Sequence, residues 1–222
     1  MDVIANLISK PFVHILAEAR SGSTTLYDAV NQGVGNQWVD RYGNTIDLSE
    51  PFKEPSSQPG FAKQLYPHKV NEICDYIIGN PDKVKVMKNI LFDVSQFDPE
   101  IQQRLFELPA YTIGLSRRNT FEQALSRCLA KITGVYHVEV WYSVLHHYKP
   151  ATKIDPNLFL EQLNITMARK QQLLDHSHLL DEIIYYEDIN FPKQFDSNKF
   201  PPKSESIANY AELQDLYHKH KA

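Results

Sequence analysis

Short apolar segments alternate with segments of helical periodicity along most of this 222-residue chain. The first apolar segment, residues 12–17, runs directly into a polar loop over residues 18–25. Apolar side chains then repeat at helical spacing, at Leu26, Ala29 and Val30. Because parallel strands are joined by long crossovers, usually helices, this order predicts βαβ units. We therefore expect an α/β protein with a three-layer P-loop-like fold, in which helices flank a central, mainly parallel sheet.

Later segments continue the alternation. Strands are predicted over residues 83–87, 111–115 and 182–186, and helices over 65–78, 101–108, 121–129, 156–174 and 207–216. Asp98-Pro99 and Asp155-Pro156 are typical helix starts, and the spacing of Asn119 and Glu122 predicts a capping box. Residues 36–60 and 133–154 have no clear periodicity and are expected to be loops. A chain of this length suits one domain over residues 1–222.

Composition narrows the function classes. The chain has 23 basic and 27 acidic side chains, a net charge of −4, which argues against a general nucleic-acid-binding surface. Two cysteines cannot supply a disulfide framework, and no apolar window approaches the length of a membrane span. We expect no membrane span, a cytoplasmic location and, because no metal-ligand cluster occurs, no metal.

The loop over residues 18–25 has the features of an anion site. It joins a strand to a helix N-terminus, where free N–H groups and the helix dipole favour phosphate or sulfate. Gly22 allows close backbone approach, and Arg20 offers a cationic fork. Hydroxyl donors stand on both sides of the glycine, at Ser21, Ser23, Thr24 and Thr25. Ser23 stands where a Walker A motif would have lysine. The alternative interpretation is an ordinary strand-to-helix turn with Ser/Thr capping.

A second polar loop follows the strand predicted over residues 111–115. It carries Arg117, Arg118 and Asn119, and Ser126 lies two helical turns further on. Alone, this is compatible with a solvated basic turn. Together with the first loop, it suits a ligand with two separated phosphate-like groups.

These residues resemble the sulfotransferases that use 3′-phosphoadenosine 5′-phosphosulfate (PAPS). Residues 20–24 resemble the 5′-phosphosulfate loop of that family, and Arg118 with Ser126 resembles the motif that binds the 3′-phosphate. Tyr186, in a Tyr-Glu-Asp sequence, resembles the residue beside the adenine, and Lys88 resembles the strand lysine at the transfer site. The motifs occur in the family's order and span most of the chain.

The resemblance implies an enzyme that moves a sulfuryl group from PAPS to a hydroxyl or amine of a small molecule, sugar or lipid, leaving PAP. It implies that Arg20 and Lys88 act in catalysis and that Glu50, before a proline, is the general base. Glu54 and His14 are rival bases, although a lone histidine in an apolar run is usually a packed core residue. Lys203 is expected to close over the 3′-phosphate.

The departures from the family leave alternatives open. Leu26 stands where the cytosolic phenol and steroid enzymes have tryptophan, Thr120 replaces a proline, and Ile90 stands at the position of their catalytic histidine. The pattern is closer to bacterial sugar- or lipid-type enzymes. The loops over residues 36–60 and 133–154 are expected to shape the acceptor site, and a homodimer is possible. The alternative functions are a P-loop-like nucleotide or small-molecule kinase and an inactive PAP-binding module.

Overall fold

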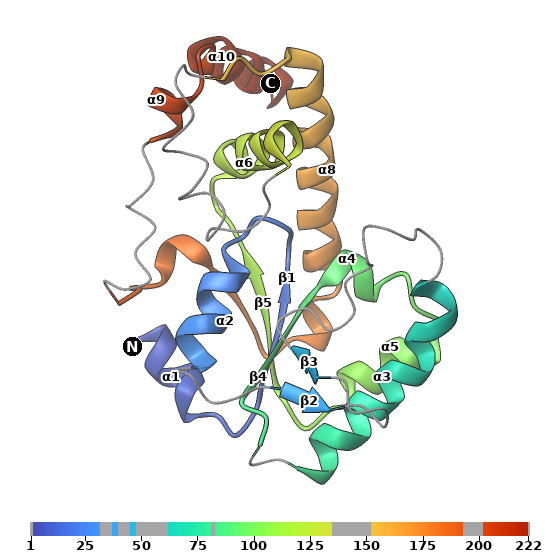
Figure 1. Cartoon of the computed structure of the whole chain (residues 1–222). Helices are drawn as coiled ribbons and strands as arrows, with labels where there is room; N and C mark the ends of the chain where they lie inside the picture. Colours follow the sequence, from blue (N-terminus) through green and yellow to red (C-terminus); the bar gives the residue numbers. More distant parts are fainter. Residues whose placement is uncertain are drawn as a thin grey trace. The chain divides into compact units, whose positions relative to one another are not determined.

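The structure is a computed structural model (Figure 1). It describes residues 2–31, 37–39, 45–47, 62–80, 83–134, 152–192 and 202–221, with only the backbone for 37–39, 45–47 and 62–69. The chain divides into two compact units. Unit 1 comprises Met1–Ser116 and Lys170–Phe195, and unit 2 comprises Arg117–Arg169 and Asp196–Ala222. The assignment of one domain to residues 1–222 stays a prediction.

Unit 1 is built on a four-stranded sheet in which every pair of neighbours is parallel. In the order in which they neighbour one another, its strands are β4 (Val86–Ile90), β1 (Val13–Ala17), β5 (Tyr111–Ser116) and β6 (Glu182–Tyr185). All five residues of β1 are buried, as expected for a central parallel strand covered on both faces. The predicted α/β class and parallel sheet are therefore confirmed.

Helices cover both faces of this sheet (Figure 1). The covering elements are α1 (Val3–Ser9) and α2 (Ser23–Asn31) on one face, and α3 (Ala62–Gly79) and α5 (Pro99–Phe106) on the other. Alternate residues of β1 supply the two cores, because successive side chains on a strand point to opposite faces. Ile15 packs with the α1–α2 layer, and Leu16 packs with the α3–α5 layer. Apolar burial on both faces makes the strand ends a fixed platform for a site.

Local signals explain where several of these helices begin. Asp2 caps α1, because its Oδ1 accepts hydrogen bonds from the N–H groups of Ile4 and Ala5 at 3.0 and 3.4 Å. Pro99 occupies the first turn of α5, where a missing N–H costs nothing. α1 was not predicted, although Asp2 before an apolar run was the signal for it.

Two strands lie within the predicted loop over residues 36–60. β2 (Gln37–Val39) and β3 (Thr45–Asp47) pair antiparallel as a separate two-stranded sheet. β4 is shifted by three residues from the strand predicted over 83–87, and the short helix α4 (Leu91–Val94) follows it directly. The shift matters because it places Lys88 at the middle of the strand, opposite Ile15 of β1.

Unit 2 is helical in the part that the structure describes. Its elements are α6 (Thr120–Thr133), most of α8 (Pro156–Asp175), α9 (Lys203–Ser206) and α10 (Tyr210–Lys221). Phe121 lies in their common core and makes edge contacts with Phe159 and Tyr210 at centroid distances of 5.6 and 5.3 Å. The helices predicted at 121–129 and 156–174 are confirmed. The last turns of α8 belong to unit 1, which also holds the 3₁₀ helices η1 (Ser177–Leu179) and η2 (Tyr186–Asp188).

No helix in the described ranges is long and apolar enough to cross a membrane.

Candidate functional site

The sheet order places a topological switch point in unit 1. From β1 the chain goes to β4 on one side, and from β4 it crosses to β5 on the other side of β1. Open parallel sheets bind ligands outside the carboxyl ends of the two strands at which this reversal occurs. Here those strands are β1 and β5, which end at Ala17 and Ser116. The loop predicted to bind an anion is the one that leaves β1 at this position.

The loop after β1 is held in an unusual backbone conformation. Arg20 has φ +68° and Gly22 has φ +88°. Glycine adopts a positive φ freely, but a residue with a side chain does so at a cost of about 1 kcal/mol or more. Strain of this kind is typical of functional sites, where the surrounding structure holds it. The turn is closed by the Ser21 N–H, which donates to the Glu18 carbonyl at 3.2 Å.

The N-terminus of α2 points its backbone donors into this loop. The Leu26 N–H donates to the Gly22 carbonyl at 3.1 Å, so the helix proper starts at Ser23. Helix geometry leaves the N–H groups of Ser23, Thr24 and Thr25 without helical acceptors. Gly22 has no side chain with which to cap them. An anion in the loop would accept these hydrogen bonds and meet the positive end of the helix dipole.

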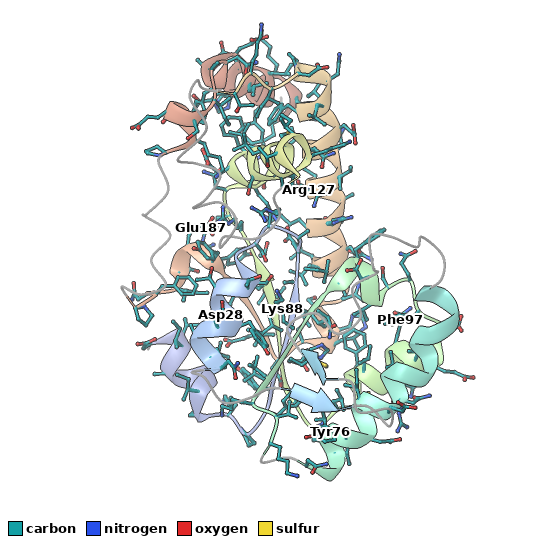
Figure 2. All side chains as sticks on the ribbon, in the orientation of Figure 1. Asp28, Tyr76, Lys88, Phe97, Arg127 and Glu187 are labelled. Carbon is teal, nitrogen blue, oxygen red and sulfur yellow. The ribbon has the colours of Figure 1, made fainter. Side chains whose placement is uncertain are left out.

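Lys88 brings a buried positive charge to the same helix start. Its side chain is 1% exposed, and its Nζ donates to Thr24 Oγ1 at 2.9 Å. Figure 2 shows Lys88 in the interior of unit 1, beside α2. An ammonium group in a low-dielectric position next to a helix N-terminus favours an anionic ligand, because the two positive fields add. The structure thus places Lys88 beside the loop after β1, but in the middle of β4 and not at the end of its strand, where the sequence placed it. Its catalytic role stays a prediction.

Ser21 adds a second polar group to the loop. Its side chain is fully buried, and its Oγ has no hydrogen-bond partner among the residues that the structure describes. A buried hydroxyl without a partner is rare, because leaving it unsatisfied costs about 1–3 kcal/mol. This orphan hydroxyl is an independent sign that the loop takes a polar ligand.

Glu18 and Ser116 join the ends of the two switch-point strands. Ser116 Oγ donates to Glu18 Oε1 at 2.5 Å, and both side chains are 2% exposed. Sequence reasoning did not single out this pair. The signal for it was that each residue lies where a predicted parallel strand ends.

Tyr186 follows β6 and packs on the backbone of the loop. A Cβ added at Gly22 would lie 2.2 Å from both Cδ2 and Cε2 of the Tyr186 ring. The ring also contacts Phe191, at a centroid distance of 5.1 Å. Only glycine fits at position 22, for this steric reason as well as for its positive φ. Sequence reasoning expected Tyr186 beside an adenine and did not foresee this contact.

Unit 2 holds the remaining described candidates. Arg118 is exposed just before α6, and Ser126 is half-buried on α6. The predicted cap is present, because Asn119 Oδ1 accepts from the Glu122 N–H at 3.1 Å. The Glu122 carboxylate bonds instead to Lys203 Nζ and the Tyr210 hydroxyl, each at 2.8 Å. Burial and this carboxylate raise the pKa of Tyr210 to about 12.

The hydrogen bonds of Glu122 affect the expected contact of Lys203 with a 3′-phosphate. Its ammonium and the Glu122 carboxylate form an ion pair whose side chains are 22% and 24% exposed. A phosphate group would have to compete with Glu122 for this lysine. The 3′-phosphate role of Lys203, like those of Arg118 and Ser126, stays a prediction.

The expected general bases Glu50 and Glu54 lie outside the described residues. Within the described ranges, no group of three or more His, Cys, Asp or Glu side chains could hold a metal ion.

His14, the third candidate base, is a core residue. It is fully buried on β1, and its Nε2 lies 3.0 Å from Asn89 Nδ2, which places the Nε2 as the acceptor. Burial lowers the pKa of His14 from 6.5 to about 3. At 0% exposure the ring is packed within the core, as the interpretation of a lone histidine in an apolar run expected.

His14 predicts a pH dependence of stability. In the unfolded chain it titrates near its ordinary pKa, so between that value and about 3 the unfolded state binds more protons. Stability therefore falls as the pH drops, by about 2 kcal/mol between about pH 7 and about pH 5 for this one group. Urea unfolding of the wild type and of His14→Gln at both pH values tests this. The free energy of unfolding of His14→Gln should change less between the two pH values than that of the wild type. Equal changes in the two proteins would contradict the assignment of His14 as a buried, neutral histidine.

Comparison with protein-family models finds no match to this chain, and no curated protein matches it. The family resemblance therefore rests on the motifs, and the site rests on its own geometry.

Proposed function

We propose that this chain is a PAPS-dependent sulfotransferase that sulfates a hydroxyl or amine of a small molecule, sugar or lipid. The observation that carries the proposal is the hydrogen bond from buried Lys88 to Thr24, at the first turn of α2. It joins a cation from one strand to the backbone donors of the loop that leaves the next strand. In the Walker A alternative the cation belongs to the loop itself, next to the last glycine.

The proposed reaction needs the charge distribution that this loop has. The S–O bond of the phosphosulfate breaks, a new bond forms from sulfur to the acceptor oxygen or nitrogen, and the acceptor proton passes to a base. Negative charge develops on the bridging oxygen that leaves with the nucleotide, and fixed donors at that oxygen lower the barrier. Lys88, Arg20 and the free N–H groups of α2 would supply them. Glu50 is the proposed base.

The 3′-phosphate distinguishes PAP from an ordinary nucleotide. Arg118 and Ser126 are proposed to bind it, on the sequence resemblance alone, and Arg118 is exposed and therefore accessible to a ligand. A charge-assisted contact of this type contributes about 1.5–3 kcal/mol.

Calorimetric titration of the purified chain with PAP, with ADP and Mg-ATP as controls, tests the proposal. We expect the chain to bind PAP with clearly higher affinity than ADP. Arg118→Ala should lower PAP affinity by about 30-fold, which equals about 2 kcal/mol, and leave ADP affinity unchanged. Arg127→Ala is the matched control, because Arg127 lies on α6 and bonds to Gln162 Oε1 at 3.2 Å.

Three other outcomes have definite meanings. Preference for Mg-ATP would replace the sulfotransferase by the kinase. No preference for PAP, or an unchanged affinity in Arg118→Ala, would contradict the two-loop hypothesis. PAP binding without turnover of labelled PAPS across a broad acceptor panel would identify an inactive binding module.

A further inference from the structure

Tyr186 has a position that the expected adenine contact does not explain. Its ring lies against the backbone of Gly22 and occupies the space where a β-carbon of residue 22 would stand. Gly22 is the residue that ends the loop and opens α2, and it has a positive φ. The ring therefore lies on one of the two loop residues that have a positive φ; the other is Arg20.

The segment that carries this ring is anchored on both sides. Before it, Ile184 of β6 is buried in the core beneath α1 and α2; after it, Ile189 is buried in the same core. Phe191 packs on that core and also on the Tyr186 ring. A hydrogen bond of 3.2 Å from the Ile189 N–H to the Tyr186 carbonyl closes the turn between them. The ring is thus held against the loop by a segment that is anchored in the core on both sides.

The loop itself needs such support. Arg20 is held at φ +68°, a conformation that a residue with a side chain leaves unless its surroundings hold it. Binding an anion to a loop that is already ordered avoids the entropy cost of ordering it at the moment of binding.

We infer that Tyr186 is a positioning residue: its ring clamps Gly22 so that the anion loop keeps its binding conformation in the absence of ligand. This rests on the proposed function only in requiring that the loop binds a phosphate- or sulfate-like group. Because the ring acts on the loop and not on the ligand, it should raise the affinity for every anion that the loop binds. A ring that stacks on a base would act only on nucleotides.

The test uses two probes, PAP and inorganic pyrophosphate, which has no base. We expect Tyr186→Ala to weaken the binding of both probes by the same factor, roughly tenfold. Without the ring, the loop becomes ordered only when the anion binds, and the entropy cost of that ordering lowers the affinity. Tyr186→Phe keeps the ring and should recover the lost affinity. Amide hydrogen exchange should speed up at residues 20–24 in Tyr186→Ala and return to the wild-type rate in Tyr186→Phe. Tyr185→Ala is the matched control, because Tyr185 is the neighbouring tyrosine and its ring faces Lys170.

Loss of PAP affinity with unchanged pyrophosphate affinity would overturn the clamp and assign the ring to the base. Unchanged affinity for both probes would overturn it as well. If Tyr186→Ala does not fold, Tyr186→Leu answers the same question, because it lacks the ring but keeps apolar volume. The sulfotransferase proposal fails separately: a wild type that binds pyrophosphate but does not prefer PAP to ADP refutes that proposal and leaves the clamp measurable.

Discussion

Gly22→Ala is expected to lower the free energy of unfolding by about 2 to 5 kcal/mol and to abolish measurable anion binding. Two costs add. A side chain at positive φ costs about 1–2 kcal/mol, and displacing a packed ring costs about 1–3 kcal/mol. The new Cβ would stand 2.2 Å from two atoms of Tyr186, a distance that forces the ring or the loop to move. Chemical unfolding and titration with PAP and pyrophosphate measure both effects.

Gly134→Ala separates the two costs. Gly134 ends α6 with φ +70°, but a Cβ there would meet nothing within 4 Å. This control should therefore cost only about 1 kcal/mol, the conformational part. In a Tyr186→Ala background, Gly22→Ala should lower the free energy of unfolding by a similarly small amount. The coupling energy between the two substitutions is then about 1–3 kcal/mol. Additive effects of the two substitutions would show that the ring does not touch the loop in solution.

Lys88→Met is expected to weaken binding of PAP and of pyrophosphate by about 10- to 100-fold, because a charge-assisted hydrogen bond contributes about 1.5–3 kcal/mol. Methionine keeps most of the buried volume, so the free energy of unfolding should change by less than about 1.5 kcal/mol. A large loss of binding without a large loss of stability is the expected signature of a ligand-directed cation.

Lys85→Met is the control for this variant. Lys85 precedes β4 on the same segment, and its Nζ donates to the Lys10 carbonyl rather than to α2. Its replacement removes one positive charge from unit 1 and should leave anion affinity within about twofold. If both variants lose the same amount of anion affinity, the effect of Lys88 comes only from the net charge of the protein. Such an effect acts at long range and is screened by salt.

The loop after β1 was predictable from sequence because its signals are local. A strand, a glycine flanked by hydroxyl residues and a helix start lie within residues 12–30 and need no distant partner to be recognised. The start of α6 was predictable for the same reason, since Asn119 caps a residue only three positions away.

The partners of these groups were not predictable, because they come from distant parts of the chain. The strand was predicted over residues 83–87 from an alternating pattern, but pairing with β1 places it at Val86–Ile90. A strand buried on both faces has no alternation to reveal its register. Glu122 was predicted as half of a capping box, yet its carboxylate bonds to Lys203 and Tyr210, more than 80 residues away.

The sequence by itself thus determined the α/β class, the strand–loop–helix unit that starts the site and the chemistry of its donors, since periodicity and helix capping act over a few residues. Only the tertiary structure decided that Lys88 reaches Thr24, that Ser116 meets Glu18 and that Tyr186 lies on Gly22. These contacts join residues 64, 98 and 164 positions apart. They follow from strand order and register, which are set by the packing of two complete cores rather than by any short pattern.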